Sequence, residues 1–279
     1  MQNQVSTQTS VENLVEMSVD SHFHVFAAQQ AVLGARYSPS YAASLATWQA
    51  ASQAVGVTHG VLVQTSFKGT DNAYLLAQLK QHPDTLRGVA VVAPSAGFAQ
   101  LEDLHGLGVR GIRLNLAGQS HDMTVWSAAK PLWDAVLQLG WHVELRTDAG
   151  ELPKVLAALP QALPIVIDHF GKPEKASLRD ETVVAVQRRS TGGAPPNVYV
   201  KLSAAYRLKA ELNAIDLAAL WLGELGPLAL LWGSDWPCTN CEAHADYQKL
   251  HGALEEWLGQ DAGAVEAARS ANAMRLYWG

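Results

Sequence analysis

The segments WHVELRT (141–147), ELPKVLAALP (151–160) and PIVIDHF (164–170) follow one another closely along the chain. The first and third are short apolar runs rich in β-branched residues, which is typical of buried strands. The middle segment carries its apolar residues at helical spacing. Because both strand-like runs are almost continuously apolar, they indicate parallel strands covered by helices rather than strands with one face in water. This part of the chain predicts one parallel strand–helix–strand unit.

The same pattern repeats on both sides of this stretch. Strand-like midpoints recur roughly every 23 to 33 residues after a first gap of about 40, and one strand–helix unit needs about that length. The eight strand-like runs are SVDSHFHVF (18–26), HGVLVQTS (59–66), RGVAVV (87–92), VRGIRLNL (109–116), WHVELRT (141–147), PIVIDHF (164–170), NVYVKLSA (197–204) and LALLWGSDW (228–236). Eight units predict a single (β/α)₈ TIM barrel of the α/β class, a fold in which about 250 residues often form one domain.

Two regions depart from the regular repeat. Residues 1–16 are polar and without periodicity, so we expect a flexible N-terminal arm followed by one barrel domain at 17–279. Residues 27–41 fill the wide first gap and predict an enlarged loop after the first strand. In this fold, loops that follow strands lie on the face where chemistry takes place.

Composition excludes several protein classes. The 279 residues are 48% apolar and 16% charged, which excludes a disordered chain and a coiled coil, and no apolar run approaches the roughly 18 residues of a membrane span. A net charge of −6 argues against nucleic-acid and anionic-membrane partners, so any anion site must be local. The two cysteines, Cys238 and Cys241, predict ordinary thiols rather than a disulfide framework. The first 35 residues lack Lys and Arg, so a secretory signal is not expected and we predict a cytoplasmic protein.

Polar residues at the carboxyl ends of barrel strands converge on one pocket. His22 and His24 end the first strand and share one of its faces, so both imidazoles can point inward. Such a pair can ligate a metal or polarise a carbonyl group, and the alternative is two hydrogen-bonded core histidines. His169 follows the sixth strand and is expected to point inward, whereas the neighbouring Asp168 is expected to face the helices as a structural hydrogen-bonding group. Asp235 emerges as the eighth strand ends, which predicts a catalytic base or ligand.

Three arginines are candidates for binding an anion. Arg113 lies late in an apolar strand and needs either a structural carboxylate or a bound anion, because an unpaired buried charge is very unfavourable. Arg146 shares a strand face with Glu144, so it either pairs with that carboxylate or contacts a ligand. Arg207 follows the seventh strand by about three residues, where it either meets substrate or stays solvated.

Several motifs together resemble a known family. VDSHFHVF (19–26), ARYSPSY (35–41), GTDN (69–72), GIRLN (111–115), IDHFGKP (167–173), KLSAAYR (201–207) and LLWGSDWP (230–237) are similar to motifs of the amidohydrolase superfamily, and within it to those of 2-pyrone-4,6-dicarboxylate hydrolases and related lactonases. The resemblance implies a hydrolase that opens a carboxylated lactone, a small anionic substrate, with base-activated water. It assigns the base to Asp235 and contact with the lactone carbonyl to the histidines. The residues expected to bind substrate are Arg113, Arg207, Arg146, Ser66 and Tyr37.

The resemblance leaves the cofactor and the exact reaction open. Metal-dependent relatives usually complete their site with a Lys or His at the end of the fifth strand, but this chain has the permanently cationic Arg146 there. We therefore predict that no metal is required, although His22, His24, His169 and Asp235 could collect a divalent ion, most readily Zn²⁺. The alternatives are a zinc-dependent decarboxylase, or another metal-dependent amidohydrolase, acting on an acidic substrate, and a barrel that only binds an anion.

The segment after Arg113 departs from the family pattern. It reads LAGQSHDM (116–123) and lacks the second arginine that pyrone dicarboxylate hydrolases carry there. Either Arg146 or Lys172 compensates, or the substrate carries one carboxylate or is another lactone.

Overall fold

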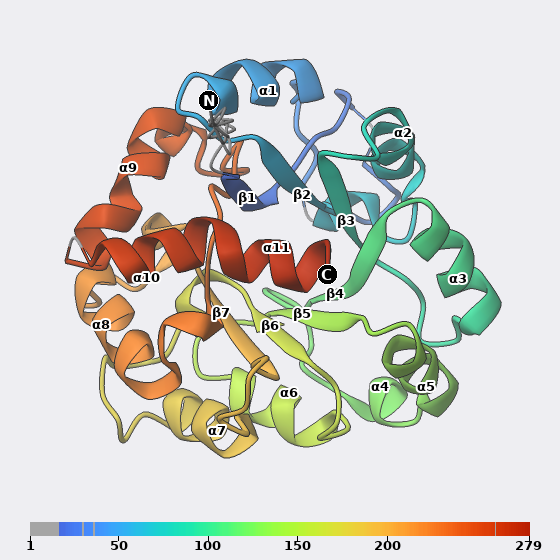
Figure 1. Cartoon of the computed structure of the whole chain (residues 1–279). Helices are drawn as coiled ribbons and strands as arrows, with labels where there is room; N and C mark the ends of the chain where they lie inside the picture. Colours follow the sequence, from blue (N-terminus) through green and yellow to red (C-terminus); the bar gives the residue numbers. More distant parts are fainter. Residues whose placement is uncertain (1–16, 30, 36, 260) are drawn as a thin grey trace, which may run out of the picture.

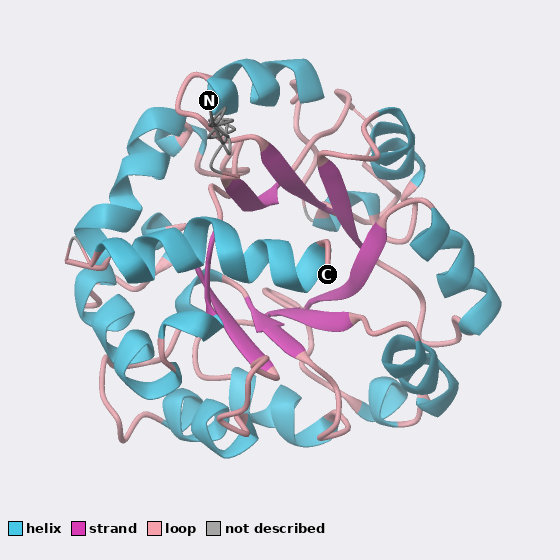
Figure 2. Ribbon diagram, in the orientation of Figure 1, coloured by secondary structure: helices cyan, strands magenta, loops and turns pink. Residues whose placement is uncertain are grey.

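The structure is a computed structural model that describes residues 17–29, 31–35, 37–259 and 261–279. The arm expected at 1–16 lies outside these residues. Eight parallel strands form one sheet in the order β1-β2-β3-β4-β5-β6-β7-β8, and the helices surround it (Figures 1 and 2). The predicted (β/α)₈ barrel is therefore confirmed.

The strands agree closely with the eight runs expected from the sequence. They are β1 Val19–Phe23, β2 His59–Val63, β3 Leu86–Ala90, β4 Val109–Asn115, β5 His142–Arg146, β6 Ile165–Ile167, β7 Val198–Leu202 and β8 Leu230–Trp232. The α-helices are α1 Leu45–Gln53, α2 Ala73–Gln81, α3 Phe98–Gly106, α4 Thr124–Ser127, α5 Lys130–Gln138, α6 Leu152–Ala158, α7 Glu181–Arg189, α8 Ala214–Leu225, α9 Tyr247–Trp257, α10 Ala262–Glu266 and α11 Asn272–Tyr277.

Several helices begin at a polar residue that caps the first turn. The side chains of Ser44, Asp180, Asn213, Asp246 and Asp261 accept hydrogen bonds from backbone N–H groups at the starts of α1, α7, α8, α9 and α10. These side chains satisfy N–H groups that the helix itself leaves unpaired. In α5 and α6 a proline occupies the first turn, where its missing N–H is not needed. None of the helices in the described part of the chain is both long and apolar enough to cross a membrane.

The barrel has two apolar layers. The larger one lies between the strands and the surrounding helices. A smaller one fills the barrel interior with valines of several strands, and it includes Ala273 and Tyr277 of α11. The Tyr277 ring lies 5.1 Å from the ring of His142, the first residue of β5, so α11 closes the amino ends of the strands (Figure 1). The carboxyl ends are left for a functional site.

Closure between β8 and β1 depends on a glycine. The segment after β8 bonds to β1 through its backbone: Asp235 N donates to His22 O at 2.8 Å, and His24 N donates to Trp236 O at 2.8 Å. A Cβ atom at Gly233 would lie 2.5 Å from Cβ of His22, closer than atoms can approach. Gly233 thus allows the close contact that brings Asp235 beside the two histidines of β1.

Candidate active site

A pocket of about 290 Å³ opens at the carboxyl ends of the strands. The residues predicted for the site line it, with the exception of His22, which lies fully buried below its floor. The predicted residues that line it are His24, Tyr37, Ser66, Arg113, Arg146, His169, Arg207 and Asp235. The structure therefore brings the strand-end residues of the sequence analysis into one place.

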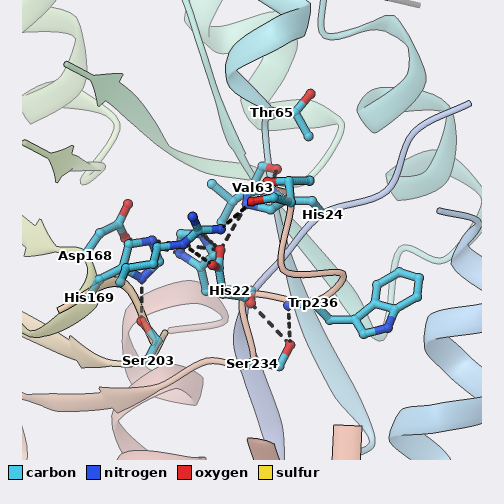
Figure 3. Close-up of polar contacts among 12 residues, drawn as sticks. His22, His24, Val63, Thr65, Asp168, His169, Ser203, Ser234 and Trp236 are labelled. Carbon is cyan, nitrogen blue, oxygen red and sulfur yellow. Dashed lines mark hydrogen bonds and ion pairs between the residues drawn. The ribbon is translucent and has the colours of Figure 1, made fainter. Parts of the chain in front are cut away.

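Three imidazoles surround one oxygen of Asp235. The Nε2 atoms of His22, His24 and His169 lie 3.6, 3.4 and 3.8 Å from Oδ1 of Asp235. His24 is fixed from behind, because its Nδ1 is 2.7 Å from the carbonyl oxygen of Val63, which can only accept (Figure 3). Nδ1 of His24 therefore carries a proton, and its Nε2 faces the carboxylate.

The other oxygen of Asp235 is anchored. Its Oδ2 accepts hydrogen bonds from the hydroxyl of Tyr206 at 2.6 Å and from Nε of Arg207 at 2.8 Å. Burial opposes ionisation of Asp235, but His169 and Arg207 hold the pKa of this carboxyl well below its ordinary value. The carboxylate is therefore ionised at neutral pH, with one oxygen held and the other turned toward the histidines.

His169 and Asp235 both have backbone conformations that residues other than glycine rarely adopt. Their φ angles are 53° and 55°, in the left-handed region, where strain of about 1–3 kcal/mol per residue is typical and functional sites are common. His169 also bonds through Nδ1 to Oγ of Ser203 at 2.8 Å (Figure 3). Burial lowers the pKa of His22 to about 3 and that of His169 well below its ordinary value, so both rings are neutral at pH 7.

The expectation that Asp168 faces the helices is wrong. Val166 belongs to the apolar cluster inside the barrel, and Asp168 shares its strand face by alternation. The chain then turns sharply at His169, so both residues reach the interior. Oδ1 of Asp168 lies 3.2 Å from Nδ1 of His22, on the side of the ring away from Asp235.

Below the histidines lies a buried network of charges. Nη2 of Arg113 donates to Asp168 at 2.8 Å, and Nζ of Lys201 lies 2.5 Å from Oε2 of Glu144 and 3.1 Å from Nδ1 of His22. All five side chains are buried, and the two cations balance the two carboxylates. Burial and then Asp168 raise the pKa of Glu144 to about 7. Burial opposes the charge of Asp168, but His22 and Arg113 hold the pKa of this carboxyl well below its ordinary value.

Lys201 was not among the residues predicted for the site. The sequence does indicate a role for it, because Lys201 is a lone lysine inside the apolar run VYVKL (198–202). A lysine in a buried strand needs an oppositely charged or hydrogen-bonding partner.

The three candidate arginines have different surroundings. For Arg113 the sequence left open a structural carboxylate or a bound anion, and the structure shows the carboxylate of Asp168. Nη1 of Arg113 also donates a hydrogen bond to the backbone oxygen of Gln64 at 3.3 Å. Arg207 pairs with Asp235 and donates to the backbone oxygen of Thr239 at 2.9 Å. Arg146 forms no pair with Glu144, which is bound to Lys201 instead, and its Nη1 is buried without a hydrogen-bond partner.

The donor set at Asp235 fits a zinc ion. Nε2 of His22 is buried without a hydrogen-bond partner, and imidazole nitrogen and carboxylate oxygen are normal zinc ligands. Zinc–ligand bonds of about 2.0–2.1 Å in a tetrahedron separate the ligand atoms by about 3.3 Å, close to the 3.4–3.8 Å found between the three Nε2 atoms and Oδ1 of Asp235. The ligand atoms of His22, His169 and Asp235 all lie within 4.8 Å of one another. His22, Glu144 and Asp168 form a second such group, but Lys201 already neutralises Glu144 there.

Comparison with known proteins identifies the family. A family model described as amidohydrolase matches residues 19–278. A 2-pyrone-4,6-dicarboxylate hydrolase of Comamonas testosteroni is 31% identical over 94% of this chain and 90% of its own length. A Pseudomonas putida structure described as a 2-pyrone-4,6-dicarboxylic acid hydrolase is 37% identical, with a TM-score of 0.82 over 94% of this chain and 98% of its own. An Acinetobacter baumannii structure with the same description, with citric acid bound, is 30% identical, with a TM-score of 0.81 over 94% and 99% of the two chains.

Proteins with the alternative activity are more distant. A 2,6-dihydroxybenzoate decarboxylase structure from Rhizobium is 16% identical with a TM-score of 0.62 over 94% of this chain and 99% of its own, which shows a shared fold alone. The resemblance inferred from the sequence motifs is confirmed, and the chain belongs to the amidohydrolase family.

Proposed function

We propose that this protein hydrolyses the ring ester of a small carboxylated lactone, of the 2-pyrone-4,6-dicarboxylate type, with water activated by Asp235. The observation that carries the proposal is the asymmetric environment of this carboxylate. Tyr206 and Arg207 hold one oxygen, and the other faces three imidazoles in a pocket that contains cations. The 2-pyrone-4,6-dicarboxylate hydrolase with 31% identity over nearly the whole chain supports the same reaction class.

The reaction needs a base, a group that stabilises the oxyanion, and a proton donor for the leaving oxygen. Oδ1 of Asp235 takes a proton from water as the water oxygen attacks the lactone carbonyl carbon. N–H groups of His22, His24 or His169 stabilise the oxyanion that forms. The ring C–O bond then breaks, and Asp235 returns its proton to the departing ring oxygen. The products are an open-chain carboxylate and an enol or alcohol.

Arg207 links substrate binding to the strength of the base. Its Nε bond to Asp235 contributes to the low pKa of that carboxyl. A substrate carboxylate bound by Arg207 would draw the guanidinium away from Asp235 and raise the basicity of Asp235. Arg113 has three of its five N–H groups on protein acceptors, so two remain for substrate.

The other predicted contacts lie at the pocket wall. Ser66 begins the short turn after β2, and the hydroxyl of Tyr37 donates to Oε1 of Glu242 at 2.7 Å, which ties the enlarged β1–α1 loop to the segment after β8. We assign both, with Arg146, to substrate binding.

We further propose that turnover does not require a tightly bound metal. His22, His24, His169 and Asp235 would hold a zinc ion, which when bound supplies Lewis-acid polarisation of a carbonyl group. The end of β5, where relatives usually complete such a site, carries the permanent charge of Arg146 in the same pocket, and this charge opposes a divalent cation. Elemental analysis before and after chelator treatment tests the point. Stoichiometric zinc whose removal abolishes turnover contradicts it.

A pH-indicator screen of carboxylated lactones tests the function, because ring opening releases a proton at neutral pH. We expect Asp235→Asn to lower kcat by at least about 100-fold. The control is Asp103→Asn, which removes the same charge from the exposed face of α3. Near-normal turnover by a folded Asp235→Asn protein rejects this base. Release of CO₂ from an acidic substrate without lactone opening favours the decarboxylase instead.

A further inference from the structure

We propose that Arg146 and Lys172 form a separate anion subsite that binds a second carboxylate of the substrate, away from the reacting carbonyl. This inference rests on the proposed lactone hydrolysis for the identity of the substrate. It adds which side chains bind the second carboxylate in a chain that lacks the second arginine of the family after Arg113.

The two cations differ from the others of the pocket in their hydrogen bonds and ion pairs. Within the described residues, no ion pair or side-chain hydrogen bond joins Arg146 or Lys172 to another group, and Nη1 of Arg146 is buried with its hydrogen-bonding capacity unused. The other cations of the pocket differ in this respect, because Arg113 pairs with Asp168 and Arg207 pairs with Asp235. A partly buried cation without a partner is unfavourable, so the folded protein retains two groups that an anion would stabilise.

The two side chains come from neighbouring strands and meet in one pocket. Arg146 is the last residue of β5, and Lys172 follows the short turn after β6 with a φ of 46°. Both line the pocket that contains Asp235. Burial and the charge of Arg146 lower the pKa of Lys172, as expected for two cations that lie close together. Because the strands follow chain order round the barrel, β5 and β6 lie across the pocket from the β1 histidines.

Asp148, whose charge partly offsets the lowering of the pKa of Lys172 by burial and Arg146, has another role. Asp148 lines the same pocket, but its Oδ2 accepts the backbone N–H of Gly118 at 2.7 Å and thereby holds the loop after β4. Asn115 of β4 lies beside Arg146 of β5 in the strand register. Its side-chain oxygen is buried without a hydrogen-bond partner, so its amide contributes to the same wall of the pocket. This side of the pocket therefore combines two free cations with an amide.

This set of groups suits a carboxylate. The planar guanidinium of arginine can bind both carboxylate oxygens, and the lysine ammonium supplies a compact charge. Arg207 and the histidines lie around Asp235, so a carboxylate between Arg146 and Lys172 leaves the lactone carbonyl free to reach the base. Charged hydrogen bonds are worth about 1.5–3 kcal/mol, which corresponds to about a tenfold to hundredfold effect on binding.

The test compares three lactones in the intact enzyme: 2-pyrone-4,6-dicarboxylate, 2-pyrone-4-carboxylate and 2-pyrone-6-carboxylate. Arg146→Gln and Lys172→Gln should each lower kcat/KM for the dicarboxylate by about tenfold to a hundredfold, mainly through KM. They should do the same for one of the monocarboxylates and change the other by less than about twofold. Lys172→Arg should retain most of the activity. Lys175→Gln, which removes a charge from an exposed position of the same loop, should have no effect. Equal losses for all three lactones, or no loss for any, overturn the subsite.

Calorimetric titration with isophthalate separates this inference from the proposed function. This dicarboxylate has no ester to hydrolyse, and we expect both Gln variants to weaken its binding by about tenfold or more. If no lactone is hydrolysed but isophthalate binding depends on Arg146 and Lys172, the lactonase proposal fails and the subsite stands. If lactones are hydrolysed and the variants bind isophthalate like the wild type, the subsite fails and the lactonase stands. Unchanged melting temperatures without ligand show that the variants are folded, since neither substitution leaves a protein group unpaired.

Discussion

Lys201→Met tests whether the buried charge network below the histidines is needed for folding. The Lys201 side chain is fully buried, and its Nζ lies 2.5 Å from Glu144, 3.1 Å from His22 and 3.8 Å from Asp168. Methionine has a similar length and no charge, so the substitution removes the cation and largely keeps the volume. The variant leaves Glu144 without its ammonium partner inside the barrel.

The expected loss follows from the energetics of buried ion pairs. Removing one partner of such a pair typically costs about 3–5 kcal/mol. At roughly 2–4 °C per kcal/mol for a domain of this size, the melting temperature should fall by about 6–20 °C. The loss should depend on pH, because the pKa of Glu144 is already raised to about 7 and rises further without Lys201. A carboxyl whose pKa is higher in the folded state than in the unfolded state destabilises the fold as pH rises through the folded pKa. The free energy of unfolding of the variant should therefore be lower at pH 8 than at pH 5.

Urea unfolding followed by tryptophan fluorescence measures both effects. The chain has nine tryptophans, several of them buried in the core. The double variant Lys201→Met/Glu144→Gln removes both charges and should recover much of the stability at pH 8, which a double-mutant cycle expresses as a coupling energy. A loss below about 1 kcal/mol at pH 8, or an equal loss at both pH values, would refute the reasoning.

Three further predictions follow from the packing and charges of the site. Gly233→Ala should destabilise the protein by about 1–3 kcal/mol, because its Cβ would lie 2.5 Å from Cβ of His22; an unchanged melting temperature would show that β8 can move away from β1. Arg113→Met should lower stability by about 3–5 kcal/mol in addition to raising KM, since it removes the guanidinium that pairs with the buried Asp168; a variant with only a raised KM would show that this guanidinium serves substrate alone. Isophthalate affinity should be full at neutral pH and fall as pH rises through the pKa of Lys172, which burial and Arg146 lower from 10.5. Lys172→Arg should abolish this pH dependence, and a wild-type affinity that stays constant up to pH 10 would contradict a role for the Lys172 charge.

The fold could be predicted because its signals are local. Each strand is a short apolar run, each helix has apolar residues at helical spacing, and their alternation leaves few arrangements other than a barrel. The strand-end rule then brought His24, His169 and Asp235 into one pocket without any knowledge of side-chain contacts. These predictions need only the carboxyl end of each strand and the order of the strands along the chain, and both can be read from the sequence.

Partners across the barrel could not be predicted in the same way. Asp168 was expected on the wrong side because His169 was taken to share the inward strand face, whereas Val166 and Asp168 lie on that face and the left-handed backbone of His169 turns its own side chain inward as well. Whether Arg146 pairs with Glu144 or contacts a ligand depended on whether another residue binds Glu144. Lys201, which lies 57 residues further along the chain, binds it. Contacts between distant strands depend on the barrel register and on how far each side chain reaches, and local sequence patterns do not predict such contacts.

The site has two kinds of cation, and the difference bears on how it works. Lys201 and Arg113 are buried with carboxylates, so they set the position of His22 and contribute to the fold. Arg146 and Lys172 have no such partners within the described residues, and repulsion from other cations disfavours their charges: burial, Arg113 and Arg207 lower the pKa of Arg146, and burial and Arg146 lower that of Lys172. At the proposed subsite a substrate anion would relieve that repulsion, so part of its binding energy would come from charges that the protein leaves uncompensated. The protein carries a net charge of −6, yet the proposed anion subsite needs only this local excess of positive charge at the ends of β5 and β6.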